Sequence, residues 1–76
     1  MRTSSLGGKI IREVRGARGY SQAELAIRTG FAKNTLWNWE NGVCCPSFDN
    51  VVMICEYLGF TVSEAMELTH EFDQAA

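Results

Sequence analysis

The chain has 76 residues and a formal net charge of −2, which is enough for one small domain whose elements share a single hydrophobic core. No run of residues approaches the roughly 18 consecutive apolar residues of a membrane span, and the first residues, MRTSSLGG, lack the apolar stretch of a secretion signal. We therefore expect a single cytoplasmic domain over residues 1–76 that has no membrane partner.

The charges divide the chain into two halves. Residues 1–43 hold all seven Lys and Arg residues against three Glu residues, a net charge of +4, whereas residues 44–76 hold six acids and no Lys or Arg, a net charge of −6. Screening limits charge interactions to roughly 8 Å in physiological salt, so a bound anion would experience mainly the half that it contacts. The first half can therefore bind nucleic acid, and a solvated acidic surface on the second half is compatible with this.

A first helix is expected to begin near Leu6. Its apolar residues recur at helical spacing: Leu6, Ile10, Ile11, Val14 and Ala17. This spacing predicts an amphipathic helix of about three turns. The glycines within residues 16–19 end it.

The stretch from Ser21 to Gly42 predicts two short helices joined by a turn. Ser21 and Glu24 have the spacing of a capping box, so a helix should begin at Gln22. Gly30 can adopt the left-handed conformation that ends it. In the second helix, three apolar residues share the inward side: Ala32, Leu36 and Trp39. The outward side carries groups able to contact base edges or phosphates: Lys33, Asn34, Trp37, Asn38 and Asn41. This pattern is typical of a helix-turn-helix over about residues 21–42.

Two further helices are expected after a loop at Val43–Pro46. Ser47 is placed to cap the fourth helix, whose apolar stripe is Phe48, Val51, Val52, Cys55 and Leu58. Thr61 and Glu64 form a second capping box before a fifth helix over about residues 62–72. The apolar side of this fifth helix consists of Val62, Ala65, Met66, Leu68, Thr69 and Phe72. The sequence therefore predicts a compact all-α domain of five helices.

The three cysteines, Cys44, Cys45 and Cys55, are expected to be free thiols, because their number is odd and nothing indicates secretion. A zinc site that uses them with His70 is the alternative, but adjacent cysteines are poorly spaced for tetrahedral coordination. No Ser, Cys or His constellation indicates a nucleophile with its base. We expect neither an enzyme nor a cofactor.

The chain resembles the Cro/repressor-type (lambda-repressor-like, Xre) helix-turn-helix domains over roughly residues 6–68. Several short signals fall in one register: Arg18-Gly19, Ser21-Gln22, Leu25-Ala26, Gly30, Trp39-Glu40 and Asn41-Gly42. The resemblance implies a bundle of five helices that usually binds double-stranded DNA as a dimer. It also implies an ion pair between Arg15 and Glu40 that joins the first helix to the third.

The same resemblance, with the outward face derived above, indicates seven DNA-binding residues: Gln22, Lys33, Asn34, Thr35, Trp37, Asn38 and Asn41. Lys33 and Asn34 match positions that reach base edges, while Gln22 and Asn41 match positions that meet the DNA backbone. Gln22 can alternatively cap its own helix, and the polar residues of the third helix can form an ordinary solvated surface. Ala32 departs from the family pattern, which has a capping Ser or Thr there.

Two functions are therefore open. The first is a sequence-specific DNA-binding transcriptional regulator, expected to be a dimeric repressor joined through Met66, Thr69 and Phe72 of the fifth helix. In the alternative for this helix, its apolar residues only close the core of a monomer. The second function is a protein-interaction module, such as an antitoxin-like partner, that binds through Trp37 or the fifth helix.

Overall fold

The computed structural model describes the backbone of residues 6–75 and the side chains of residues 6–69. This part of the chain contains five α-helices and no strand: α1 (Leu6–Ala17), α2 (Gln22–Thr29), α3 (Lys33–Glu40), α4 (Phe48–Tyr57) and α5 (Val62–Ala75). The predicted all-α, five-helix fold is confirmed, and α5 continues three residues beyond its expected end.

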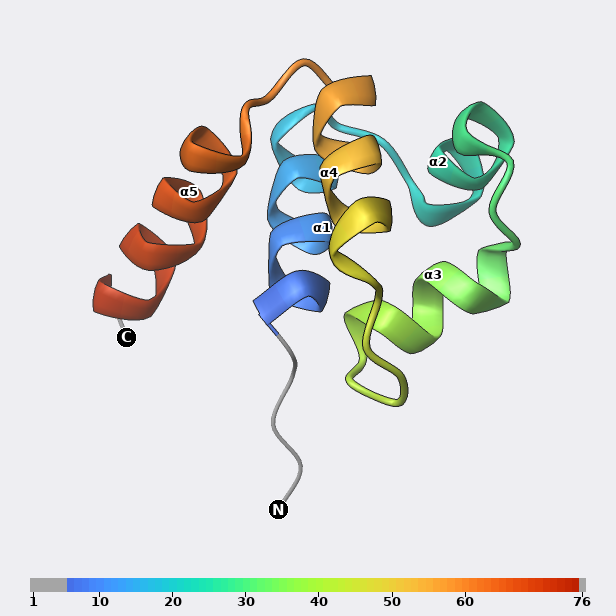
Figure 1. Ribbon diagram of the computed structural model, residues 1–76, viewed down its shortest axis with the longest axis horizontal. Helices are drawn as coiled ribbons and strands as arrows, with labels where there is room; N and C mark the ends of the chain where they lie inside the picture. The colour runs from blue at the N-terminus through green and yellow to red at the C-terminus, as the bar shows by residue number, and fades with distance from the viewer. Residues whose placement is uncertain (1–5, 76) are drawn as a thin grey trace.

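Helix α1 is the centre of the bundle, because it packs against α3, α4 and α5. In Figure 1, α5 lies on one side of α1 and the α2–α3 pair lies on the other. Helices α2 and α3 also pack against each other. The molecule measures 32 × 30 × 22 Å along its principal axes.

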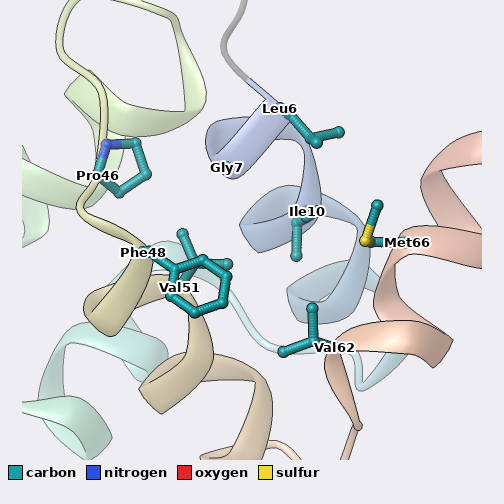
Figure 2. Close-up of a pocket in the computed structure, with 8 residues that line it drawn as sticks. All are labelled: Leu6, Gly7, Ile10, Pro46, Phe48, Val51, Val62 and Met66. Atoms are coloured by element: carbon teal, nitrogen blue, oxygen red, sulfur yellow. The ribbon is translucent and has the colours of Figure 1, made fainter.

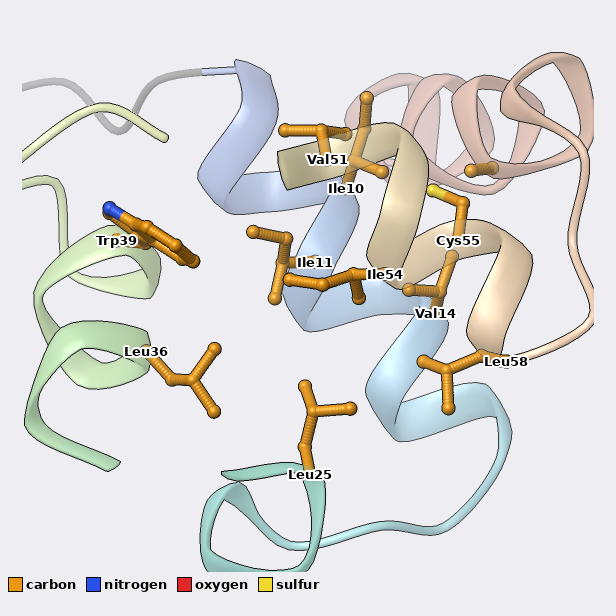
Figure 3. Packing of buried hydrophobic residues seen from close by; sticks show 11 residues of the cluster. Ile10, Ile11, Val14, Leu25, Leu36, Trp39, Val51, Ile54, Cys55 and Leu58 are labelled. Atoms are coloured by element: carbon orange, nitrogen blue, oxygen red, sulfur yellow. The ribbon is translucent and has the colours of Figure 1, made fainter. Parts of the chain in front are cut away.

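The hydrophobic core receives side chains from all five helices, and most of them converge on α1 (Figure 3). Its members are Ile10, Ile11, Val14, Leu25, Leu36, Trp39, Val51, Ile54, Cys55, Leu58 and Ala65. Phe31 packs against this cluster and meets the ring of Trp39 edge to face, with 5.1 Å between ring centroids. This contact fills the corner between α2 and α3.

Several predicted core residues are exposed instead. Leu6, Ala17 and Ala32 are solvent-exposed, the first two because they lie at the ends of α1, the third because it precedes α3. Phe48 is exposed, while Ile54, absent from the predicted stripe, is fully buried. The predicted stripe included Phe48, which lies roughly 70°, about one fifth of a turn, from the centre of the buried face of α4.

The predicted caps are present. Ser21 and Glu24 exchange hydrogen bonds in a capping box at the start of α2, and Gly30 ends that helix with a φ of 84°. Thr61 and Glu64 form the same arrangement before α5. These local signals are short in range, which is why the sequence alone locates them.

Among the helices of the described chain, none combines the length and the apolar character needed to cross a bilayer. Met66 on α5, one of the three residues expected to join two copies, has an exposed side chain. Thr69, also expected at that contact, is buried instead, and its hydroxyl donates to the carbonyl of Ala65, so this part of the prediction is wrong. Phe72 and His70 lie outside the residues whose side chains are described.

Candidate nucleic-acid interface

A buried polar cluster fixes the start of α2 and the end of α3 against α1. The Arg15 guanidinium donates from Nε to Oε2 of Glu40 and from Nη2 to Oε1, both at 2.8 Å. Arg15 also donates from Nη1 to the carbonyl of Tyr20 at 2.8 Å. Hydrogen bonding to Glu40 raises the pKa of Arg15, against a smaller opposing effect of burial, so the guanidinium stays charged. The predicted ion pair is confirmed.

Gln22 is part of the same cluster. Its amide Nε2 donates to Oε1 of Glu40 at 3.1 Å, and the side chain is half-buried. The helix cap at this end is supplied by Ser21, so the alternative in which Gln22 caps its own helix is wrong. The amide carries a second N–H, and a phosphate contact through it stays a prediction.

Five of the candidate residues lie together on the outer face of α3. At 100° per residue they span an arc of about 140°: Lys33, Asn34, Trp37, Asn38 and Asn41. All five are exposed or half-buried, while Leu36, Trp39 and Glu40, which lie outside this arc, are buried. Thr35 lies beside the arc and is half-buried. The outer face of α3 is therefore continuous and polar, and the indole ring of Trp37 is its one large apolar group.

Asn41 has an internal contact that the sequence did not reveal. Its Nδ2 donates to the carbonyl of Trp37 at 2.8 Å, at the end of α3, and the Asn41 backbone N–H also bonds to that carbonyl. The amide therefore stabilises the last turn of the helix. Its remaining N–H and its carbonyl oxygen are the groups left for a nucleic acid.

The beginning of α3 lacks a side-chain cap. Ala32 has the extended conformation of an N-cap residue, with φ −69° and ψ 142°, but it has no oxygen to accept from the first turn. The first N–H groups of an α-helix have no partner within the helix. At this end α3 therefore presents N–H groups, together with the charge of Lys33, to whatever it contacts.

Two arginines of residues 1–43 make hydrogen bonds within the protein. Arg18 donates from Nε to the carbonyl of Leu58 at 2.7 Å, and its guanidinium lies 4.4 Å from the centre of the Phe60 ring. Arg15 is held by Glu40, as described above. These contacts leave the net charge of +4 unchanged, because it already counts Glu40 against Arg15 and a carbonyl does not neutralise a guanidinium, but both arginines have fewer N–H groups left for a phosphate.

The thiols occupy two different environments. Cys44 and Cys45 are exposed in the loop after α3, and Cys55 is buried in α4. Burial, with a smaller contribution from the charge of Glu56, raises the pKa of the Cys55 thiol. Within the described residues no three His, Cys, Asp or Glu side chains group as a metal site; His70, the fourth ligand of the zinc alternative, lies outside them.

Comparison with known proteins agrees with the fold. The sequence profile of a family described as "Helix-turn-helix domain" matches residues 8–71. The chain belongs to this helix-turn-helix family. The match is consistent with the Cro/repressor-type resemblance, and it extends over all five helices. No solved structure matches the chain significantly.

Two curated proteins are similar to this helix-turn-helix chain, and both are named as candidate HTH-type transcriptional regulatory proteins. One, from Methanocaldococcus jannaschii, is 29% identical over 68 residues, which are 90% of this chain and 21% of the relative. The other, from Thermococcus kodakarensis, is 30% identical over 63 residues, which are 83% of this chain and 20% of the relative. The chain thus spans about one fifth of the length of these relatives.

Proposed function

We propose that this helix-turn-helix domain is a sequence-specific DNA-binding transcriptional regulator that inserts α3 into the major groove. The observation that carries the proposal is the continuous polar face of α3, which the Arg15–Glu40–Gln22 cluster anchors to the rest of the bundle. An α-helix fits the major groove of B-DNA, where amide and ammonium groups can pair with base edges. The regulatory names of the two relatives support the same function.

In this proposal some of the candidate residues contact bases and others contact phosphates. Lys33 and Asn34, at the exposed start of α3, contact bases, because the first turn of a recognition helix enters the groove first. Trp37 and Asn38 follow on the same face, and Thr35 lies at its border. Gln22 and Asn41 meet phosphates through the amide hydrogens that their internal bonds leave free.

Regulation by this domain is proposed to be repression by a homodimer. One recognition helix contacts too few base pairs for useful specificity, so two copies normally bind half-sites about 34 Å apart. Helix α5 is the proposed contact.

The experiment is selection of bound sites from random duplex DNA, followed by affinity measurements at several salt concentrations. We expect an enriched sequence, and an affinity that falls with salt by a slope of about 0.9 for each phosphate neutralised. A protein that selects no sequence and shows no salt-dependent shift of duplex DNA would contradict the proposal. It would favour the protein-interaction alternative, for which the exposed ring of Trp37 is the relevant observation.

A further inference from the structure

An apolar groove lies away from the polar face of α3, where α1, α4 and α5 meet. Its volume is about 380 Å³, and Figure 2 shows its walls converging from the three helices. Ile10 and Val51 form its floor, while Leu6, Phe48 and Met66 stand around its opening. None of these residues belongs to the proposed DNA contact.

The shape of this groove depends on Gly7. A Cβ atom added there would lie 2.8 Å from Cγ of Pro46 and 3.0 Å from Cγ2 of Val51, which is closer than such atoms approach. Glycine therefore lets the turn before α4 pack directly against α1. This close contact forms one end of the groove from rigid parts of the fold.

The opening of the groove is unusually apolar for a surface. Phe48 is 72% exposed, Leu6 53% and Met66 45%. Single exposed apolar side chains are common on proteins, but a group of large ones around a hollow marks an interaction site. An α-helix that inserts its apolar side chains is a recurring partner for such a groove.

The charges beside the groove favour one kind of partner. Helices α4 and α5 belong to the half of the chain that has no Lys or Arg, and their exposed acids include Asp49, the residue after Phe48, and Glu67, the residue after Met66. Only the α1 wall carries both signs, with Lys9 and Glu13. A second copy of the chain would place acids opposite acids along two of the three walls.

We propose that the groove binds an amphipathic helix of a protein partner whose apolar face is flanked by Lys or Arg. Its apolar side chains enter the space between Phe48 and Met66, and its basic flanks lie beside Asp49 and Glu67. The domain can then contact DNA through α3 and a second protein through the opposite part of the bundle. The groove shares no residue with the DNA contact of α3, so this inference can be tested separately from DNA binding, although it shares Met66 with the proposed α5 dimer contact.

The probe is a synthetic helical peptide of about 14 residues, four turns, with Leu at spacing i, i+3, i+4 and i+7 and Lys at the flanking positions. A second peptide has Glu in place of every Lys. We expect the Lys peptide to bind the wild-type domain with a Kd on the order of 10 µM by fluorescence anisotropy, and the Glu peptide to bind at least about tenfold more weakly.

Two variants separate apolar insertion from simple charge attraction. Phe48→Asp and Ile27→Asp each add one carboxylate at an exposed apolar position, but Ile27, 83% exposed, lies on α2 away from the groove. We expect Phe48→Asp to lower the affinity for the Lys peptide at least about tenfold. Ile27→Asp should leave this affinity unchanged or raise it slightly. Met66→Asp replaces Phe48→Asp if circular dichroism shows that the latter does not fold.

Three results would overturn the proposal. The first is equal binding of the two peptides, and the second is equal binding of the Lys peptide by the Phe48 and Ile27 variants. The third is sedimentation of the wild-type chain as a dimer that Phe48→Asp dissociates, since a second copy would then occupy the groove. If the groove binds a partner helix as proposed, Phe48→Asp should leave DNA affinity unchanged.

Discussion

The carboxylate of Glu40 is held in a bidentate pair by the guanidinium of Arg15, 25 residues earlier in the chain. Glu40 is only 4% exposed although it ends the helix that carries the proposed DNA contacts. Each of its oxygens accepts at least one hydrogen bond, and Oε1 also accepts from Gln22. The pair therefore sets the position of α3 relative to α1 and α2.

Glu40→Ala is expected to destabilise the domain by about 3 kcal/mol, because it leaves the guanidinium of Arg15 partly buried without its partner. Glu24→Ala is the matched control, since it removes one carboxylate from the exposed capping box of α2 and should cost about 1 kcal/mol. Urea denaturation followed by circular dichroism measures both. Equal free energies of unfolding for the two variants would show that the pair contributes little.

Ala32→Ser is expected to stabilise the domain by about 1 kcal/mol, because Ala32 already has the backbone conformation of an N-cap and lacks only the oxygen. For a domain of this size the melting temperature should rise by about 4–8 °C. Ala23→Ser, at an exposed position inside α2, is the control and should not raise it. A lower melting temperature for Ala32→Ser would mean that the first turn of α3 is held in another way.

The sequence predicted helices well where the signal is local. Ser21 with Glu24 and Thr61 with Glu64 are pairs three residues apart, so their capping boxes follow from neighbouring side chains. The burial of Ile54 could not be found in this way. It depends on how α4 is rotated against α1, which a short apolar stretch with residues on several faces does not determine.

The outer face of α3 was also predictable, because helical spacing alone groups its polar residues. The internal bonds of Gln22 and Asn41 were not, since a side-chain amide has no fixed partner until the elements are packed. The same holds for Arg18, which contributed to the sequence charge of residues 1–43 but binds the end of α4. A count of charges in the sequence therefore does not show how many guanidinium N–H groups are left for phosphates.

Cys55 is expected to react with a maleimide only after unfolding, whereas Cys44 and Cys45 react in the folded domain. Burial raises the pKa of the Cys55 thiol, so the unfolded chain loses this proton at a lower pH than the folded one. Stability should therefore fall as pH rises above the pKa of the unfolded thiol. Mass spectrometry of labelled protein counts the thiols, and a Cys44→Ser/Cys45→Ser variant isolates Cys55. Three equally fast thiols would contradict the buried position.

Phe72→Asp is expected to give a folded monomer that binds a palindromic site far more weakly. In a two-fold symmetric contact the same residues face each other, so one substitution changes both sides of the interface. Phe72 lies outside the described side chains, and it stands nearly two turns beyond Met66 on α5. Since α5 carries acids and no Lys or Arg, the dimer should tighten as salt rises, opposite to DNA binding. A wild-type chain that sediments as a monomer at high micromolar concentration, with unchanged DNA affinity in the variant, would exclude the α5 dimer.

Asn34→Ala is expected to lower affinity for the selected DNA site by about 1–3 kcal/mol and to leave affinity for random duplex DNA unchanged. The reason is that Asn34 is exposed in the first turn of α3, and an asparagine amide pairs with adenine in the major groove. Fluorescence anisotropy at fixed salt measures both affinities. Asn50→Ala, on α4, is the matched control and should change neither. If Asn34→Ala weakened the two DNAs equally, the residue would position the protein on the backbone, and base reading would have to come from Lys33 or Asn38.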